Sequence, residues 1–76
     1  MHVEILTPDE TLFNGETDMV TLPGTSGSFQ ILSSHAPLIA NLAKGEVKIG
    51  EGKDATVFQV TGGLVEVLQN KVIVLV

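Results

Sequence analysis

The feature that most constrains the fold is the spacing of turn-forming residues. Pairs such as Pro23-Gly24, Gly62-Gly63 and Asn70-Lys71 interrupt apolar runs about every eight to twelve residues. No stretch between them keeps a sustained 3.6-residue period, so no ordinary amphipathic helix is expected. This pattern is typical of a small antiparallel β-sandwich or barrel. Because 76 residues hold no repeat or linker, we expect one all-β domain over residues 1–76.

Alternation of apolar and polar residues identifies several strands and the side of each that faces the core. The residues expected to point inward are Val3, Ile5, Val20, Leu22, Val47 and Ile49. The sequence leaves the secondary structure of two segments undecided. The pair Asn14-Gly15 predicts either a hairpin turn or a bulge, and residues 37–43 fit either a short strand or a single turn.

The last two predicted strands, residues 64–69 and 72–76, are largely apolar on both faces. One face must fill the core of the domain. The other face is either covered by another layer or kept for a partner.

Composition narrows the classes of ligand. Nine acidic residues against four lysines and no arginine give a formal net charge of −5, which argues against nucleic acid or an anionic membrane surface as a partner. The absence of arginine removes the usual bidentate phosphate clamp. The chain also lacks cysteine, a signal-like segment and an apolar run long enough to span a membrane. We expect a cytoplasmic protein whose membrane contact is made through a partner.

The most irregular segment, residues 24–38, contains the candidate for nucleophilic chemistry. His35 follows Ser33 and Ser34, and an imidazole beside a serine is able to act as a general base. However, the Gly-x-Ser-x-Gly turn of a nucleophile elbow is absent, and no acid that would orient the histidine is identifiable. We therefore expect His35 to order its loop or contact a partner. His2 is expected to be solvated, and neither a catalytic nor a metal site is expected.

Lys53 supports an alternative function. It lies at the tip of a predicted polar hairpin, residues 50–54. Small β-sandwich carriers present one lysine at such a tip for covalent lipoyl or biotinyl attachment. Those motifs place the lysine after Met or Asp, whereas here it follows Gly52. The mass of the native protein would show whether Lys53 is modified.

Residues 27–39, which read Gly-Ser-Phe-Gln-Ile-Leu-Ser-Ser-His-Ala-Pro-Leu-Ile, resemble the hallmark segment of the ATP synthase epsilon subunit family. That family carries a Gly-x-Leu/Phe-Gly-Ile-Leu-x-x-His-Ala-Pro-Leu pattern there. The resemblance extends to residues 12–15, to the Gly-x-Val-x-Ile strand at 45–49 and to Gly-Gly-Leu-Val-Glu-Val at 62–67. The His-Ala-Pro-Leu and Gly-Gly-x-x-Glu-Val elements are specific together, in this order and spacing, and weak apart.

The resemblance implies a sandwich of about ten short strands at the foot of the central stalk of a bacterial F-type ATP synthase. Such a subunit is non-catalytic, carries no cofactor, and couples ion-driven rotation to ATP synthesis. It is peripheral, on the cytoplasmic face of the inner (plasma) membrane, and contacts the membrane only through the complex. The family places contact with the c-subunit ring at Ser26, Gly27, Ser28, Phe29 and Gln30. It places contact with the gamma subunit at His35, Ala36, Pro37, Leu38, Ile39 and Ala40.

The chain departs from the family pattern in several places. Gln30 stands where the family often has glycine, Ser33-Ser34 stands where Pro-Gly or Pro-Asn is common, and Ser28 occupies a position that is often acidic. Family members usually continue into a C-terminal helical hairpin that brakes ATP hydrolysis and in some binds ATP. Because this sequence ends at Val76, we expect neither the brake nor a nucleotide site.

Overall fold

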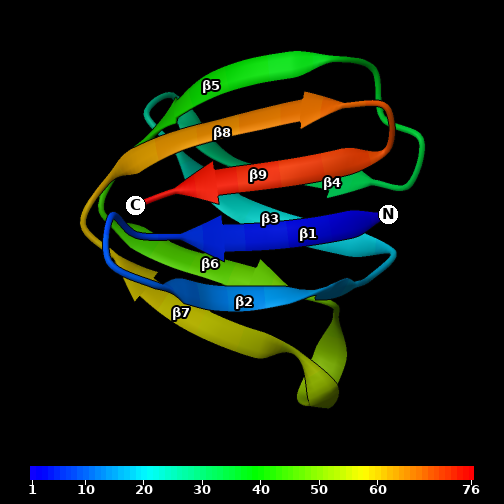
Figure 1. The fold of residues 1–76 in the computed structure, drawn as a ribbon, viewed down its shortest axis with the longest axis horizontal. Helices are drawn as coiled ribbons and strands as arrows, with labels where there is room; N and C mark the ends of the chain where they lie inside the picture. Colours follow the sequence, from blue (N-terminus) through cyan, green and yellow to red (C-terminus); the bar gives the residue numbers. More distant parts are fainter.

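The computed structural model describes residues 1–76. The chain forms nine strands and one turn of 3-10 helix (Figure 1). In chain order these are β1 (His2–Leu6), β2 (Thr11–Glu16), β3 (Met19–Gly24), β4 (Gly27–Leu32), β5 (Leu38–Leu42), β6 (Gly45–Ile49), η1 (Gly52–Asp54), β7 (Thr56–Val60), β8 (Gly63–Leu68) and β9 (Lys71–Leu75). The all-β prediction is therefore confirmed, and the ambiguous segment 37–43 contains a strand, Leu38–Leu42, rather than a single turn. None of the elements is a helix long and apolar enough to cross a membrane.

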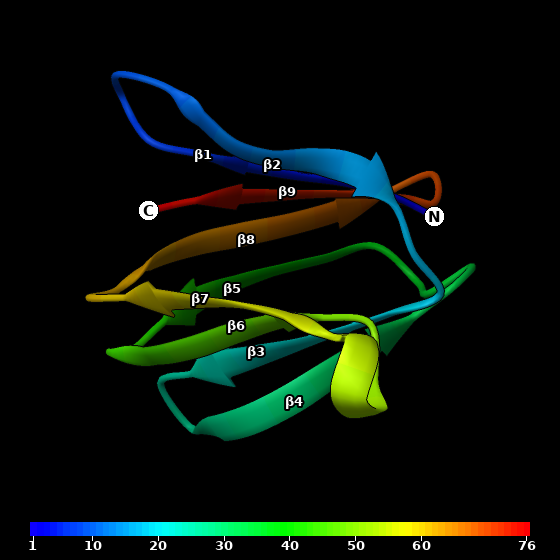
Figure 2. The ribbon, with the colours of Figure 1, turned by 90° about the horizontal axis from the view of Figure 1, so that it is seen from below.

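The strands belong to one curled sheet that folds into two facing layers (Figure 2). One layer has the order β2-β1-β9-β8-β5, and the other contains β4, β3, β6 and β7. The layers are joined through β5 and β3, which pair at Gly24 and Leu42. At the opposite side β2 and β7 are the two ends of the sheet, and the rings of Phe13 and Phe58 pack edge to face there, with centroids 6.0 Å apart. The sheet is thus a sandwich and not a closed barrel.

The core lies between the two layers and is entirely apolar. Fourteen residues are buried, and no polar or charged residue is among them. All six residues predicted to point inward are in this cluster, with Val3, Ile5, Val20, Leu22 and Val47 fully inaccessible. The alternation of apolar and polar residues identified them, because one face of each strand packs in the core and the other faces solvent.

The nine strands agree with the prediction of about ten short strands. The prediction of a purely antiparallel sheet was wrong in one pair: β1 lies parallel to β9, with Val3 opposite Val72. Consecutive parallel strands need a crossover connection, but β1 and β9 are the first and last strands and are not consecutive, so none is needed. Because the two strands lie at opposite ends of the sequence, no local pattern reveals their pairing.

The pair Asn14-Gly15 forms neither a hairpin turn nor a bulge. Both residues lie inside β2, opposite Glu4 and Val3. The ring of Phe13 lies over Gly15, where an added Cβ would come within 3.2 Å of the ring, so glycine leaves room for the aromatic side chain. The irregularity in this ladder falls two residues earlier, between the pairs Ile5–Phe13 and Leu6–Thr11, where Leu12 is the extra residue.

Candidate functional site

The segment predicted to contact the c-ring forms the β3–β4 turn and most of β4. Ser26, Gly27, Ser28 and Gln30 are exposed, and Phe29 is half-buried against the core. Strand β4 pairs with β3 along one edge and has no strand on its other edge. Small polar side chains and an unpaired strand edge are therefore presented together to solvent.

The segment predicted to contact gamma begins in a loop and continues into β5. His35, Ala36 and Pro37 are exposed, and β5 then alternates between half-buried Leu38 and Ala40 and an outward Ile39 that is 67% exposed. Strand β5 pairs with β8 along its length. The other edge of β5 contacts β3 only near its end, where Thr25 N donates to Asn41 O at 3.2 Å.

His35 has a structural role in its loop. Its backbone N–H donates to the Leu32 carbonyl at 3.2 Å, and its ring Nδ1 lies 2.7 Å from the Ala36 carbonyl oxygen, a geometry that uses the ring as a donor. No carboxylate is hydrogen-bonded to the ring, and the two neighbouring serines line none of the hollows on the surface. This arrangement orders the chain before Pro37 and gives no support to a role as a general base.

A side chain from the turn between β8 and β9 fixes the same loop. Ser34 N donates to Asn70 Oδ1 at 2.7 Å, and both residues have positive φ angles, 65° and 61°. Asn tolerates this conformation better than most residues and supplies the acceptor as well. Asn70 therefore holds the 33–37 loop against the end of the β8–β9 hairpin.

We predict that Asn70→Gly will loosen the loop without changing the turn, because glycine keeps the positive φ and removes the acceptor. The expected loss is about 1 kcal/mol in the free energy of unfolding, with faster hydrogen exchange at the Ser34 amide. Asn70→Asp retains an acceptor oxygen and serves as the control. Unchanged exchange at Ser34 in Asn70→Gly would contradict this role.

The two predicted contact segments meet around one hollow. It has a volume of about 390 Å³ and lies between the β3–β4 turn, Phe29 and β5. Its lining residues are Gly24, Thr25, Ser26, Gly27, Phe29, Leu38, Ile39, Ala40 and Asn41, and none of them is charged. Gly24 is required here, because a Cβ at this position would lie 2.7 Å from the Gly27 carbonyl oxygen and 2.8 Å from the Phe29 ring.

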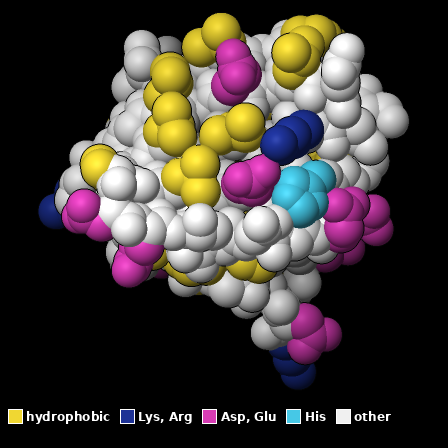
Figure 3. Space-filling model, viewed as in Figure 1, with side chains coloured by type: hydrophobic (Ala, Val, Ile, Leu, Met, Phe, Trp, Pro, Cys, Tyr) yellow, Lys and Arg dark blue, Asp and Glu magenta, His cyan; other side chains and the backbone are white.

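A second surface was only partly expected from the sequence. Residues 64–76 were predicted to have an apolar second face, and that face is uncovered. It carries the outer apolar patch, which consists of Ile39, Leu64, Leu68, Ile73 and Leu75. Leu68 is 52% exposed and Leu75 is 46% exposed, and Figure 3 shows apolar side chains gathered on this side of the molecule. The sequence indicated this surface through the apolar residues on both faces of segment 64–76. Which residues lie next to one another on it depends on the register of strand pairing, which the sequence does not show.

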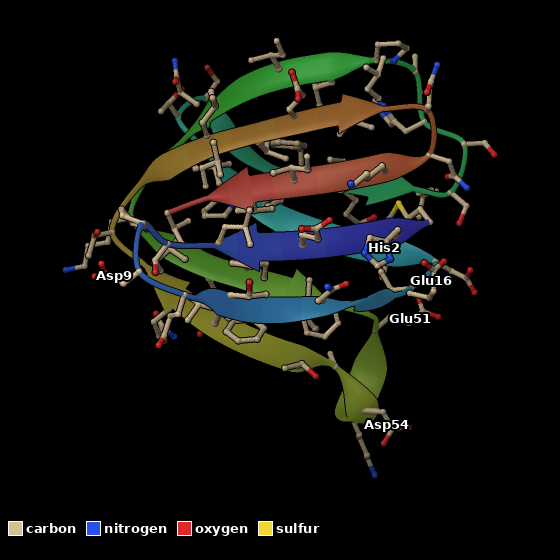
Figure 4. The ribbon with its side chains drawn as sticks, in the orientation of Figure 1. His2, Asp9, Glu16, Glu51 and Asp54 are labelled. Carbon is tan, nitrogen blue, oxygen red and sulfur yellow. The ribbon has the colours of Figure 1, made fainter.

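A charged corner borders this patch. His2 Nδ1 lies 2.8 Å from Glu16 Oε2, and the two side chains face each other (Figure 4). Lys71 Nζ lies 3.1 Å from Glu4 Oε1. His2 lies on β1 with its side chain 36% exposed, as expected of a solvated strand residue, and the structure adds that its ring contacts carboxylates. No group of three or more residues here or elsewhere has the geometry of a metal site.

Lys53 lies in η1, the exposed turn between β6 and β7, as its position at a polar tip predicted. It lines none of the hollows on the surface. Strands β6 and β7 pair antiparallel, so the predicted hairpin is present, and a single-turn 3-10 helix forms its tip.

Comparison with known proteins decides the family. The model of the family described as "ATP synthase, Delta/Epsilon chain, beta-sandwich domain" matches residues 1–76. The chain belongs to this family. The resemblance inferred from residues 27–39 and 62–67 is thereby confirmed, as is the sandwich fold. The family is that of a non-catalytic stalk subunit, which leaves nucleophilic chemistry based on His35 and the carrier function based on Lys53 without support.

Relatives in this family carry the name "ATP synthase epsilon chain". The one from Caulobacter vibrioides is 39% identical over 88% of this chain and 78% of its own length. The one from Leptospira interrogans is 39% identical over 99% of this chain, and the one from Chlorobaculum tepidum is 42% identical over 96%. The match spans 59% of the Leptospira protein and 84% of the Chlorobaculum protein.

Solved structures show the same fold. A chain in the central stalk and c-ring of the Tetrahymena thermophila mitochondrial ATP synthase matches 97% of this chain with a TM-score of 0.81 and 25% identity, over 60% of that chain. A chain in the Euglena gracilis mitochondrial ATP synthase matches 96% with a TM-score of 0.86 and 21% identity, over 48% of that chain. The second match shows the fold alone.

Proposed function

We propose that this chain is a rotor subunit of an F-type ATP synthase, which binds the gamma subunit and the c-ring and couples ion-driven rotation to ATP synthesis. The observation that carries the proposal is the hollow at the β4–β5 side. The two segments were predicted separately, and each contributes three residues to the lining of that one hollow: Ser26, Gly27 and Phe29 from the ring segment, and Leu38, Ile39 and Ala40 from the gamma segment. A sandwich that contacts both partners there links them directly.

The chemistry of the two segments suits the two partners. Ser26, Ser28 and Gln30 offer exposed hydroxyl and amide groups to the polar loops of a ring of c subunits. Leu38 and Ile39 offer apolar surface to a protein partner, and Ile39 is largely uncovered in the free chain. Because a close-packed sandwich deforms little under load, it suits the transmission of torque between them.

The proposal includes a place in the cell. As part of the complex, the chain would lie on the cytoplasmic face of the inner (plasma) membrane, held there by gamma and the ring. Its net charge of −5 disfavours direct binding to anionic lipid, so attachment through these protein partners is consistent with its composition.

Single-cysteine cross-linking tests the proposed contacts, because the chain has no cysteine of its own. Ser28→Cys and Ile39→Cys would each be labelled with a photoactivatable maleimide in assembled ATP synthase. We expect Ser28→Cys to give a product with c and Ile39→Cys to give a product with gamma. Lys53→Cys is the control, because Lys53 lies in η1, between β6 and β7, and this connection is at the end of the molecule away from β5 (Figure 1). Yields no higher than this control at both positions would overturn the proposal.

A further inference from the structure

The outer apolar patch has one acidic residue at its centre. Glu66 on β8 is exposed and lies opposite Ile39 on β5 and opposite Ile73 on β9. Its neighbours two residues away on the same strand face, Leu64 and Leu68, are also in the patch. The side chains next to Glu66 on this face are therefore apolar on all four sides.

The carboxylate of Glu66 has no partner within the chain. The ion pairs of the structure join Glu4 or Glu16 to His2, Lys71 or the N-terminal ammonium, and none reaches Glu66. No side-chain hydrogen bond involves Glu66 either. Lys71, the nearest cation by register, is opposite Leu68 and pairs with Glu4 at 3.1 Å.

Glu66 and Leu68 both line two hollows on this face. One, of about 350 Å³, also includes Pro37 and Leu38. The other, of about 210 Å³, extends to Lys71 and Ile73. Protruding side chains of a partner would fit on both sides of the carboxylate.

These observations specify the chemistry of the surface that binds here. A partner that covers the patch removes Glu66 from water. The free energy required to bury an unpaired carboxylate is larger than the free energy gained from the surrounding apolar contacts. The cost is avoided if the partner brings a lysine or arginine to this point. An apolar partner surface that lacks a lysine or arginine at this point binds more weakly for the same reason, so the patch discriminates between partner surfaces.

We propose that Glu66 is the residue that determines the specificity of gamma docking, pairing with one basic side chain of gamma inside an otherwise apolar contact. This inference rests on the proposed function, because it takes gamma as the partner. The patch is continuous with the proposed gamma segment: Ile39 belongs to both, and Pro37 and Leu38 line the hollow beside Glu66. In the free chain the carboxylate keeps this apolar face soluble.

Binding of the 76-residue chain to gamma from the same organism tests the inference, with affinity measured by titration calorimetry at two salt concentrations. We expect Glu66→Gln to weaken binding about 30-fold or more, and Glu66→Lys to weaken it further, because a desolvated charge pair is broken. Wild-type affinity should fall with added salt more steeply than that of Glu66→Gln. Thermal unfolding of the variants should match the wild type, because Glu66 is exposed.

Glu51→Gln and Glu51→Lys are the matched controls. Glu51 is exposed in the β6–β7 connection (Figure 4), and its substitution makes the same change in net charge. Equal effects at both positions, or an affinity of Glu66→Gln within twofold of the wild type, would overturn the role of Glu66 while leaving gamma binding intact. A wild-type chain that does not bind gamma at all would overturn the proposed function and this inference with it.

Discussion

Gly63→Ala is expected to remove a large part of the stability of the domain. Gly63 has a φ of +143°, and a Cβ there would overlap the Leu75 carbonyl oxygen and lie 3.1 Å from the Leu75 carbonyl carbon. The unfavourable backbone angle and the forced separation of β8 from β9 together cost about 2 to 6 kcal/mol. A 76-residue domain has a total stability of about 4 to 11 kcal/mol. Urea unfolding followed by circular dichroism measures the loss.

Gly52→Ala separates the two contributions. Gly52 also has a positive φ, +69°, but nothing lies within 4 Å of an added Cβ. Only the backbone term of about 1 kcal/mol is expected there. A Gly63→Ala variant no less stable than Gly52→Ala would show that the close approach of β8 to β9 is not as described.

The second large effect is expected for Ile31→Ala. Ile31 is fully buried, and it is the one buried residue of β4, a strand held to the sheet by β3 alone. Removing its side chain leaves a cavity at a cost of about 2 to 5 kcal/mol. Because β4 carries Ser28 and Gln30, the proposed contact with the c-ring should weaken as well. Urea unfolding measures the first effect, and cross-linking from Ser28→Cys measures the second.

Leu32→Ala is the neighbouring control for this substitution. Leu32 is also on β4, but its side chain points outward and is 54% exposed. We expect a change of about 0.5 kcal/mol or less and an unchanged cross-link. Equal losses for the two variants would mean that β4 is not anchored through Ile31.

The parts of the fold that depend on local pattern were predictable. Val3, Ile5, Val47 and Ile49 alternate with polar residues, and such alternation has one explanation, a strand with one packed face. The segment 37–43 was ambiguous because it lacks that alternation. Its assignment as β5 depends on pairing with β8, which lies more than twenty residues further along the chain.

Long-range pairing explains what was missed. Asn14-Gly15 has the composition of a tight turn, but tertiary contacts override it: β2 runs on beside β1, and the ring of Phe13 occupies the space that Gly15 leaves. The parallel pairing of β1 with β9 likewise joins the two ends of the sequence, and no local signal encodes it.

The candidate site also has a part that the sequence predicted and a part that depends on strand pairing. The two contact segments came from a family motif, and the structure adds that Phe29 of one and Ile39 of the other line the same hollow. Glu66 was present in the Gly-Gly-x-x-Glu-Val motif but was assigned no role. Its importance depends on the apolar residues opposite it on β5 and β9, and that register is fixed only when the three strands pair.

The measurement that tests the central claim most directly is complex formation with gamma. The purified 76-residue chain and gamma from the same organism would be mixed and separated by size-exclusion chromatography, with the mass of each peak determined by light scattering. A rotor subunit of the kind proposed here should elute with gamma as a complex of one copy of each. Separate elution of the two proteins, at concentrations where both are folded, would contradict the proposal.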